Sequence, residues 1–273
     1  MRLSLAATFL AMFVAVAAAP ALVSAESGDE PIAEAKVVII VGPVESSTKS
    51  YKRRANEAYA EAIKYTSDVT KVYSPNASWK IVKAATAGAS LVIYLGHGNG
   101  WPSPYVNDPN YTTKDGFGLN AKKGHGNRNV KYRGEPYMSE LDLAPDAVII
   151  LNHLCYASGN SEPGRADPKR RVARKRVDNY GAAFLKAGVA AVIAEAHGGI
   201  TTYIRDLFTT DLPLEDVWRG AWNVHGNELS FPSVRTEGAM AYTDTDKATS
   251  GYYRSLVLQP GKTAADFRAG FGL

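Results

Sequence analysis

Four short apolar runs give the chain its clearest pattern. They are continuous rather than alternating, and they are rich in β-branched residues. Such runs are typical of strands that are buried on both faces, as in a parallel sheet. The sequence therefore predicts buried strands at 36–41, 91–95, 147–151 and 189–194.

Helical spacing fills the intervals between these runs. After the first run, apolar residues recur with the period of one helix face; they are Tyr51, Ala55, Ala58, Tyr59, Ala62 and Ile63. A weak strand at 69–73 and a helix at 76–87 follow, with Asn76 as the candidate N-cap and Gly88 beyond the helix end. Because strands and helices alternate, the pattern predicts an α/β fold with a mostly parallel sheet and helices on both faces.

The second half of the chain is less regular. Residues 101–143 are rich in Gly, Asn, Pro and Tyr and show no period, so we expect loops there, with room for a short hairpin. A helix face is then formed by Val177, Tyr180, Phe184 and Leu185, and Gly188 ends that helix. A further helix at 214–222 and a strand at 255–258 complete the expected elements.

The N-terminus has the three parts of a secretory signal peptide. Arg2 supplies the positive start, residues 5–16 supply an apolar core, and small residues at 23–25 precede polar residues from Glu26. We therefore expect export, with removal of residues 1–25. No later segment is long and apolar enough to cross a bilayer, so the mature chain should lack a transmembrane segment.

The mature chain, residues 26–273, is long enough for one α/β domain with a large core. No linker or repeat divides it, so we expect a single domain with a core at about 36–194 and a C-terminal extension at 195–273.

The charge of the chain is modest and unevenly spread. The net charge is +4, and the stretch from Lys169 to Arg176 alone holds six basic residues and no acid. A nucleic-acid binder would carry basic residues over a whole face, so we expect no nucleic-acid partner. The stretch is expected to be a solvated helix start, with contact to an anionic surface as the alternative.

Three chemically active side chains follow three of the predicted strands. His97, Cys155 and His197 lie just beyond the strands at 91–95, 147–151 and 189–194, and ligands bind at the carboxyl ends of such strands. Cys155 is the only cysteine, so it cannot form an internal disulfide. Its thiol is buried and inert, paired with another chain, or used in chemistry.

Two of these strand ends resemble those of the caspase, legumain and gingipain group of cysteine peptidases, clan CD. In that group a buried third strand ends in His-Gly, and a buried fourth strand ends in the nucleophilic Cys. The matching segments are LVIYLG before His97-Gly98 and AVIILNHL before Cys155, although the usual Ala before the Cys is Leu154 here. Over about 36–194, the resemblance implies an α/β fold of the caspase-haemoglobinase type and a cysteine endopeptidase that acts on peptides or proteins. Together with the expected signal peptide, it predicts a secreted enzyme.

Thiol chemistry is consistent with these roles. A thiol attacks as the thiolate, and His97 can take its proton as general base. Glycine allows close approach of the backbone, so the N–H groups of Gly98 and Cys155 are the candidate oxyanion hole. The loop with Asn99, Trp101 and Tyr105 is a candidate substrate wall or, equally, a rigid loop folded back on the sheet.

The remaining histidines leave two alternatives open. His153 and His197 are expected at the cleft, His153 mainly as a hydrogen-bonded structural residue on the Cys155 side of its strand. If His153 joined His97, the site could be that of a metal-dependent hydrolase, but no tight ligand motif supports a metal, so we expect neither metal nor cofactor. The other alternative is a non-catalytic exported binding domain of the same fold, with Cys155 buried.

The signal peptide gives a direct prediction. Protein recovered from outside the cytoplasm should begin at or near Glu26, because the small residues before it suit signal peptidase. N-terminal sequencing or intact-mass spectrometry measures this. Soluble exported protein that retains Met1 would contradict it.

Overall fold

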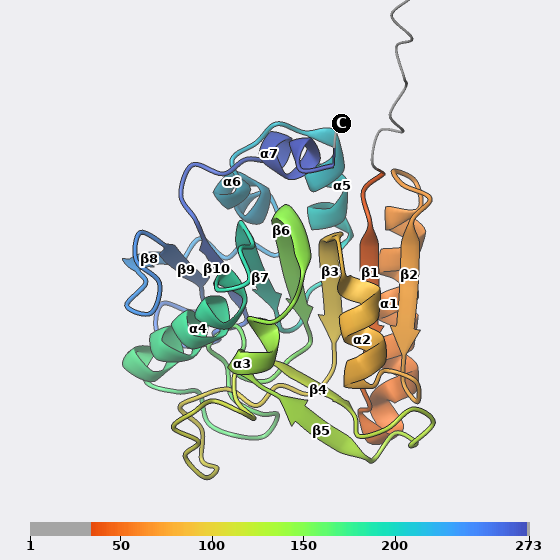
Figure 1. Cartoon of the computed structure of the whole chain (residues 1–273). Helices are drawn as coiled ribbons and strands as arrows, with labels where there is room; N and C mark the ends of the chain where they lie inside the picture. Colours follow the sequence, from red (N-terminus) through yellow and green to blue (C-terminus); the bar gives the residue numbers. More distant parts are fainter. Residues whose placement is uncertain (1–33, 272–273) are drawn as a thin grey trace, which may run out of the picture. The chain divides into compact units, whose positions relative to one another are not determined.

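Eight strands form one sheet in residues 34–271, the part of the chain that the computed structural model describes (Figure 1). In spatial order they are β2 (Val69–Tyr73), β1 (Val37–Val41), β3 (Ala89–Leu95), β6 (Leu143–Asn152), β7 (Ala191–Glu195), β10 (Arg254–Leu258), β9 (Met240–Asp244) and β8 (Glu228–Pro232). The first five are parallel to one another, and β10, β9 and β8 continue the sheet in antiparallel pairs. The predicted mostly parallel α/β sheet is confirmed.

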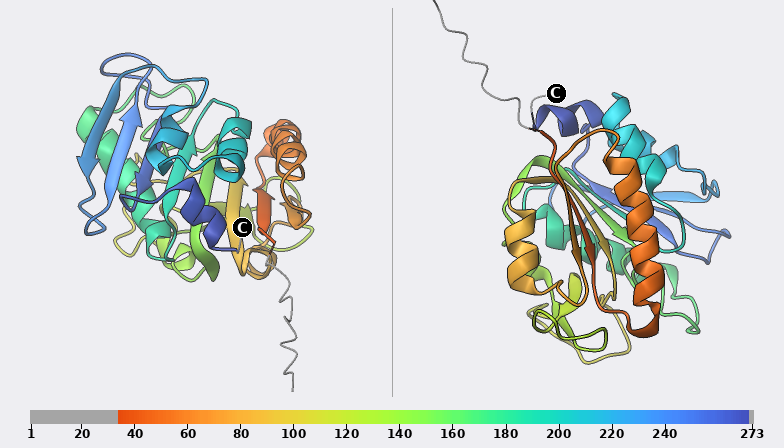
Figure 2. Two further views of the ribbon diagram at one scale, coloured as in Figure 1. Left: turned by 90° about the horizontal axis from the view of Figure 1, so that it is seen from above. Right: turned by 90° about the vertical axis from the view of Figure 1, so that its right-hand side faces the viewer.

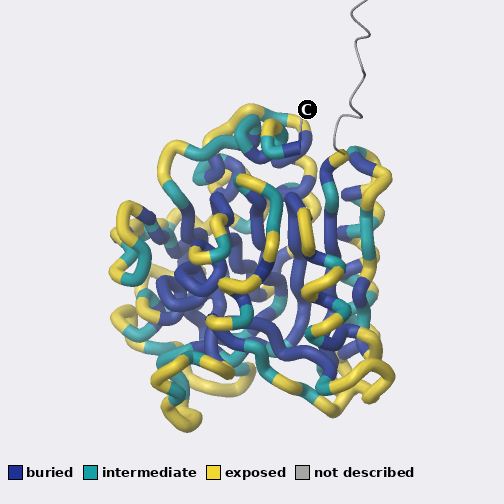
Figure 3. Tube along the Cα trace, in the orientation of Figure 1, coloured by how far each residue is buried: buried dark blue, intermediate teal, exposed yellow. Residues whose placement is uncertain are grey.

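The two strands that precede His97 and Cys155 are direct neighbours. β3 and β6 pair in parallel over most of their length. β6 begins at Leu143, earlier than the predicted start at 147, and its last six residues are buried. β3 is buried along its whole length, as the dark tube in Figure 3 shows.

Helices cover both faces of the sheet, as predicted (Figure 2). Alternate residues of a strand point to opposite faces, so Val38 and Ile40 of β1 pack in one core layer and Ile39 in the other. The first layer is covered by α2 (Trp79–Thr86), α3 (Glu135–Met138) and α4 (Arg170–Leu185). The second is covered by α1 (Thr48–Ala62), α5 (Thr201–Thr209), α6 (Leu214–Arg219) and α7 (Ala264–Ala269), with the 3-10 turn η1 (Glu45–Ser47) before α1.

Two helix boundaries differ from the prediction. α2 begins at Trp79 and not at 76, because Asn76 is held in a turn in which its N–H donates to the Tyr73 carbonyl at 2.9 Å. Ser78 occupies the N-cap position. α6 ends at Arg219, which leaves Trp222 in the loop that follows.

The predicted C-terminal extension contributes directly to the central sheet. β10 was predicted as a strand, whereas β8, β9, α5 and α7 were not. β8 and β9 each have only five residues and mixed burial, which gives little apolar signal. β9 pairs with β10, and β8 pairs with β9, so these pairings supply the order that the sequence pattern of β8 and β9 lacks.

The polar stretch before β6 contains a hairpin of β4 (Phe117–Asn120) and β5 (Val130–Arg133). The buried hydroxyl of Tyr94 joins this hairpin to β3. It accepts a hydrogen bond from the Gly118 N–H at 2.9 Å and donates to the Gly118 carbonyl at 2.8 Å. The hairpin therefore lies against the carboxyl end of β3, as Figure 1 shows.

The expected signal peptide, residues 1–25, lies outside the described residues. Among residues 34–271, the structure contains no helix with the length and apolar character needed to span a membrane.

The packing of α4 on β10 gives a stability prediction. A Cβ at Gly181 would lie 2.5 Å from the Cβ of Val257. Alanine favours a helix over glycine by about 1 kcal/mol, but overpacking costs about 1–3 kcal/mol. Gly181→Ala should therefore lower the free energy of unfolding by about 1 kcal/mol in urea titration.

Lys175→Ala, at an exposed position of the same helix, is the control and should change stability by less than about 0.5 kcal/mol. A Gly181→Ala chain as stable as the parent would show that the helix can move away from β10 at little cost.

Candidate active site

Three strands end in one row at the same edge of the sheet. Leu95 of β3 pairs with Asn152 of β6, and Asn152 pairs with Glu195 of β7. The chain beyond these residues carries His97, Cys155 and His197 within three positions. Strand register therefore brings the segments that hold the three candidate side chains to one edge.

The backbones of Gly98 and Cys155 are in contact. A Cβ at Gly98 would overlap the carbonyl oxygen of Cys155 and would lie 2.9 Å from the hydroxyl oxygen of Tyr180. Only a hydrogen atom fits at this position. Within residues 34–271, neither the Gly98 N–H nor the Cys155 N–H donates a hydrogen bond.

Backbone hydrogen bonds hold the loop that follows His97. The Asn99 N–H donates to the Tyr180 hydroxyl at 3.0 Å. The Trp101 N–H donates to Asp115 Oδ1 at 3.1 Å, and the Trp101 carbonyl accepts from Asn179 Nδ2 at 2.7 Å. Burial raises the pKa of Asp115 well above its ordinary value. The candidate substrate loop is thus fixed through its main chain.

Arg176 joins this loop to the one that follows Cys155. Its Nε donates to the Pro102 carbonyl at 2.6 Å, and one terminal nitrogen donates to the Asn160 carbonyl at 2.6 Å. The guanidinium also lies 4.7 Å from the centre of the Tyr156 ring. The expectation that the stretch from Lys169 is solvated is therefore wrong for Arg176, which is buried because both loops supply its acceptors.

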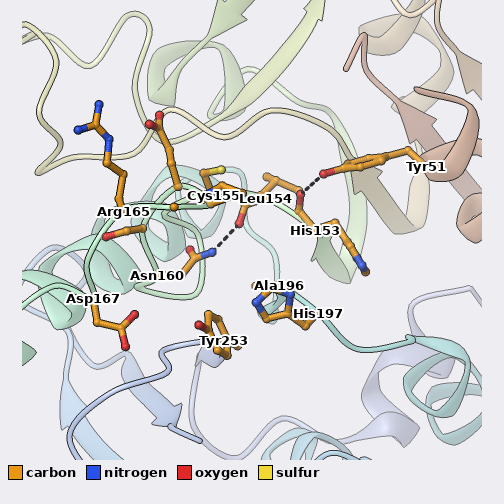
Figure 4. A pocket seen from close by; sticks show the side chains of 14 residues that line it. Tyr51, His153, Leu154, Cys155, Asn160, Arg165, Asp167, Ala196, His197 and Tyr253 are labelled. Atoms are coloured by element: carbon orange, nitrogen blue, oxygen red, sulfur yellow. Dashed lines mark hydrogen bonds between the residues drawn. The ribbon is translucent and has the colours of Figure 1, made fainter. Parts of the chain in front are cut away.

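A cleft of about 330 Å³ opens beside Cys155 (Figure 4). Its walls come from α1, the two loops beyond β6 and β7, and the start of β10. The lining residues are Tyr51, His153, Leu154, Cys155, Asn160, Ser161, Glu162, Pro163, Gly164, Arg165, Asp167, Ala196, His197 and Tyr253. His153 and His197 thus line the cleft, whereas His97, Asn99, Trp101 and Tyr105 lie outside its lining.

His153 differs from its predicted role in two respects. It follows the last residue of β6 and has φ +60°, so the alternation of a strand does not relate its side chain to that of Cys155. Its Nδ1 atom is buried and has no hydrogen-bond partner among residues 34–271, so the prediction of a hydrogen-bonded structural histidine is wrong for this atom. Burial, with smaller contributions from Arg54 and His197, lowers the pKa of His153 to about 4, and the ring is neutral.

Burial keeps the candidate dyad uncharged. It raises the pKa of the Cys155 thiol to about 11, with Glu162 as a second cause. It lowers the pKa of His97, against the opposing effects of Glu45 and Glu162. We expected an imidazolium to favour the thiolate; burial instead favours the neutral thiol and the neutral imidazole, because it disfavours both charged forms.

Glu162 is the site residue that the sequence pattern did not indicate. Its carboxylate lies near enough to act on both candidate residues. It contributes to the raised pKa of Cys155, and it partly offsets the lowering of the His97 pKa by burial. The Tyr105 hydroxyl lies 2.8 and 3.0 Å from its two oxygens and donates to this carboxylate. The contact between Tyr105 and Glu162 therefore links the loop after His97 to the loop after Cys155. Neither residue belongs to a motif.

His197 and Asn152 order the far side of the cleft. The His197 ring packs edge-on against Tyr253, with ring centres 4.1 Å apart. Asn152 Nδ2 donates to the carbonyls of Glu195 and Gly198, each at 3.0 Å. Within the described part of the chain, no group of three or more His, Cys, Asp and Glu side chains is placed to hold a metal ion.

No family model and no curated protein sequence matches this chain. Among solved structures, it is similar to a secreted C11 cysteine protease from Bacteroides thetaiotaomicron in complex with an irreversible peptide inhibitor. The identity is 11%, the TM-score is 0.39, and the match covers 77% of this chain. The chain spans only 66% of the length of that structure. These values assign the chain to no family.

The raised pKa of Cys155 predicts slow alkylation. At pH 7 a pKa of about 11 leaves about a hundredfold less thiolate than the ordinary value of 9.0. The greater intrinsic reactivity of a more basic thiolate offsets this about eightfold. Iodoacetamide should therefore react about tenfold more slowly with native than with denatured protein at pH 7, as followed by mass spectrometry, with a native rate that rises to about pH 11.

Glu162→Gln tests the electrostatic part of this shift. Removal of the carboxylate should lower the pKa of Cys155 and speed alkylation at neutral pH, whereas Asp167→Asn, which alters another cleft carboxylate, should have less effect. A native rate profile with its midpoint near pH 7 would contradict the neutral-thiol description.

Proposed function

We propose that this protein is an exported cysteine peptidase in which Cys155 is the nucleophile and His97 is the general base and acid. The observation that carries the proposal is the in-register ending of β3 and β6, with Gly98 packed on the backbone of Cys155. A cleft with Cys155 in its wall supports it, because a nucleophile must reach its substrate.

The first step starts from an uncharged pair. A peptide that enters the cleft brings its carbonyl carbon to the Cys155 sulfur, and His97 takes the thiol proton as the C–S bond forms. The carbonyl electrons move to oxygen. The N–H groups of Gly98 and Cys155, which have no partner within residues 34–271, would donate to that oxyanion.

The second step releases the products. The protonated His97 gives its proton to the leaving amine as the C–N bond breaks, and an acyl thioester remains on Cys155. Water then attacks the thioester carbonyl while His97 accepts its proton. Collapse of this intermediate frees the peptide acid and returns the proton from His97 to the sulfur. The cycle needs no cofactor or metal.

A non-catalytic exported binding domain is the second candidate, and one observation favours it. Burial disfavours both the Cys155 thiolate and the His97 imidazolium. A raised thiol pKa is also typical of a buried cysteine that takes part in no chemistry. The two functions differ in turnover: the binding domain holds a peptide in the same cleft and leaves it whole.

The peptidase proposal predicts the effect of removing either dyad member. Cys155→Ala and His97→Ala should each lower the turnover of a fluorogenic peptide library by at least about 10³-fold, because members of a catalytic unit act together. EDTA should leave activity unchanged. The acid limb of kcat/KM should lie below pH 6.5, because His97 must be neutral to act as base and burial lowers its pKa.

His153→Ala is the matched control, since His153 lines the cleft without a role in the dyad. It should change stability more than turnover. Full activity in Cys155→Ala would exclude the cysteine peptidase, and loss of activity with EDTA would favour a metal-dependent enzyme. No cleavage by the parent chain, together with bound peptide, would favour the binding domain.

A further inference from the structure

A second hollow, of about 470 Å³, lies at the same end of β7 as the Cys155 cleft. Its lining comes from the end of β7, the loop between α6 and β8, and the β9–β10 turn with the start of β10. The residues are Glu195, His197, Gly198, Trp222, Asn223, Val224, His225, Asp246, Tyr253 and Arg254. No residue of the dyad belongs to it.

Arg254 lines this hollow and has several partners. Arg254 is only 1% exposed and lies between two acidic partners, with its terminal nitrogen 2.5 Å from Asp244 Oδ2 and its Nε 3.5 Å from Glu195 Oε2. A second terminal nitrogen donates to the Trp218 carbonyl at 2.6 Å, and the guanidinium lies 4.7 Å from the Trp218 ring centre. Such a network holds its members in one geometry.

One wall carries two exposed apolar side chains. Trp222 is 71% exposed and Val224 is 47% exposed, both on the loop after α6. A tryptophan gains more than most side chains from burial, because its ring offers a large apolar area. An exposed Trp at the rim of a preformed hollow is therefore positioned to contact a ligand.

Both carboxylates that line the hollow lie beside nitrogen-bearing side chains. Its two carboxylates each have a cationic or imidazole partner: Glu195 lies beside Arg254 at 3.5 Å, and Asp246 Oδ1 lies 3.3 Å from His225 Nε2. The exposed Trp222 ring offers a large apolar area to a ligand, which favours binding of an apolar side chain.

The hollow shares a wall with the Cys155 cleft. His197 and Tyr253 line both, and their rings pack edge-on with centres 4.1 Å apart. The cleft and the hollow are therefore adjacent and are separated by these two rings.

We propose that the hollow beside Trp222 is a second side-chain subsite, which binds an apolar residue of the same peptide that occupies the Cys155 cleft. Its role in choosing a cleavage site rests on the proposed peptidase function; its ability to bind the side chain does not. Trp222 is then a specificity residue that acts by burial of its ring against the ligand.

Binding without turnover tests the subsite. The probes are N-acetyl hexapeptide amides of alanine in which one Phe is moved through the positions, titrated calorimetrically into the Cys155→Ala chain. One Phe position should bind about tenfold more tightly than the all-alanine peptide, as expected when an aromatic side chain is buried at an anchor. That preference should disappear in a Cys155→Ala, Trp222→Ala chain and persist with Trp222→Phe.

Val234→Ala is the matched control, because Val234 is exposed but lines neither the cleft nor the hollow. It should keep the Phe preference. Absence of a preferred position, or a preference that survives Trp222→Ala, overturns the subsite. If the parent chain cleaves no peptide but the Trp222-dependent preference is present, the peptidase proposal fails and the subsite stands.

Discussion

The contact between Gly98 and the backbone of Cys155 is the constraint on which the rest of the site depends. It exists because β3 and β6 pair in register and end together, so the two segments leave the sheet with no space for a side chain between them. The same contact leaves two N–H groups without partners within the described residues. A side chain at Gly98 would push the backbone of Gly98 away from that of Cys155.

One helix holds the loops on either side of that contact. α4 supplies Arg176, Asn179 and Tyr180, which bind main-chain atoms of the loop after His97, and Arg176 also binds the loop after Cys155. Because these bonds go to backbone atoms, they fix loop shape without dictating loop side chains. The positions of both site loops therefore depend on the packing of α4 against the sheet.

Burial, more than charge, sets the state of the candidate dyad. It raises the pKa of Cys155 and lowers that of His97, and Glu162 reinforces the first shift while opposing the second. The outcome is a pair that is uncharged in the free protein. In the proposed peptidase, proton transfer from Cys155 to His97 would therefore be coupled to attack on a bound carbonyl.

Four buried parallel strands and their alternation with helices could be predicted from the sequence, because continuous β-branched runs are typical of strands buried on both faces. The sequence also placed His97, Cys155 and His197 at strand ends. The β8–β9 pairing, the burial of Arg176 and the position of Glu162 near Cys155 could not be predicted from the sequence, since each depends on contacts between separate segments of the chain. The charge state of Cys155 was decided only by the tertiary structure, because desolvation is a property of the packed surroundings and not of the residue.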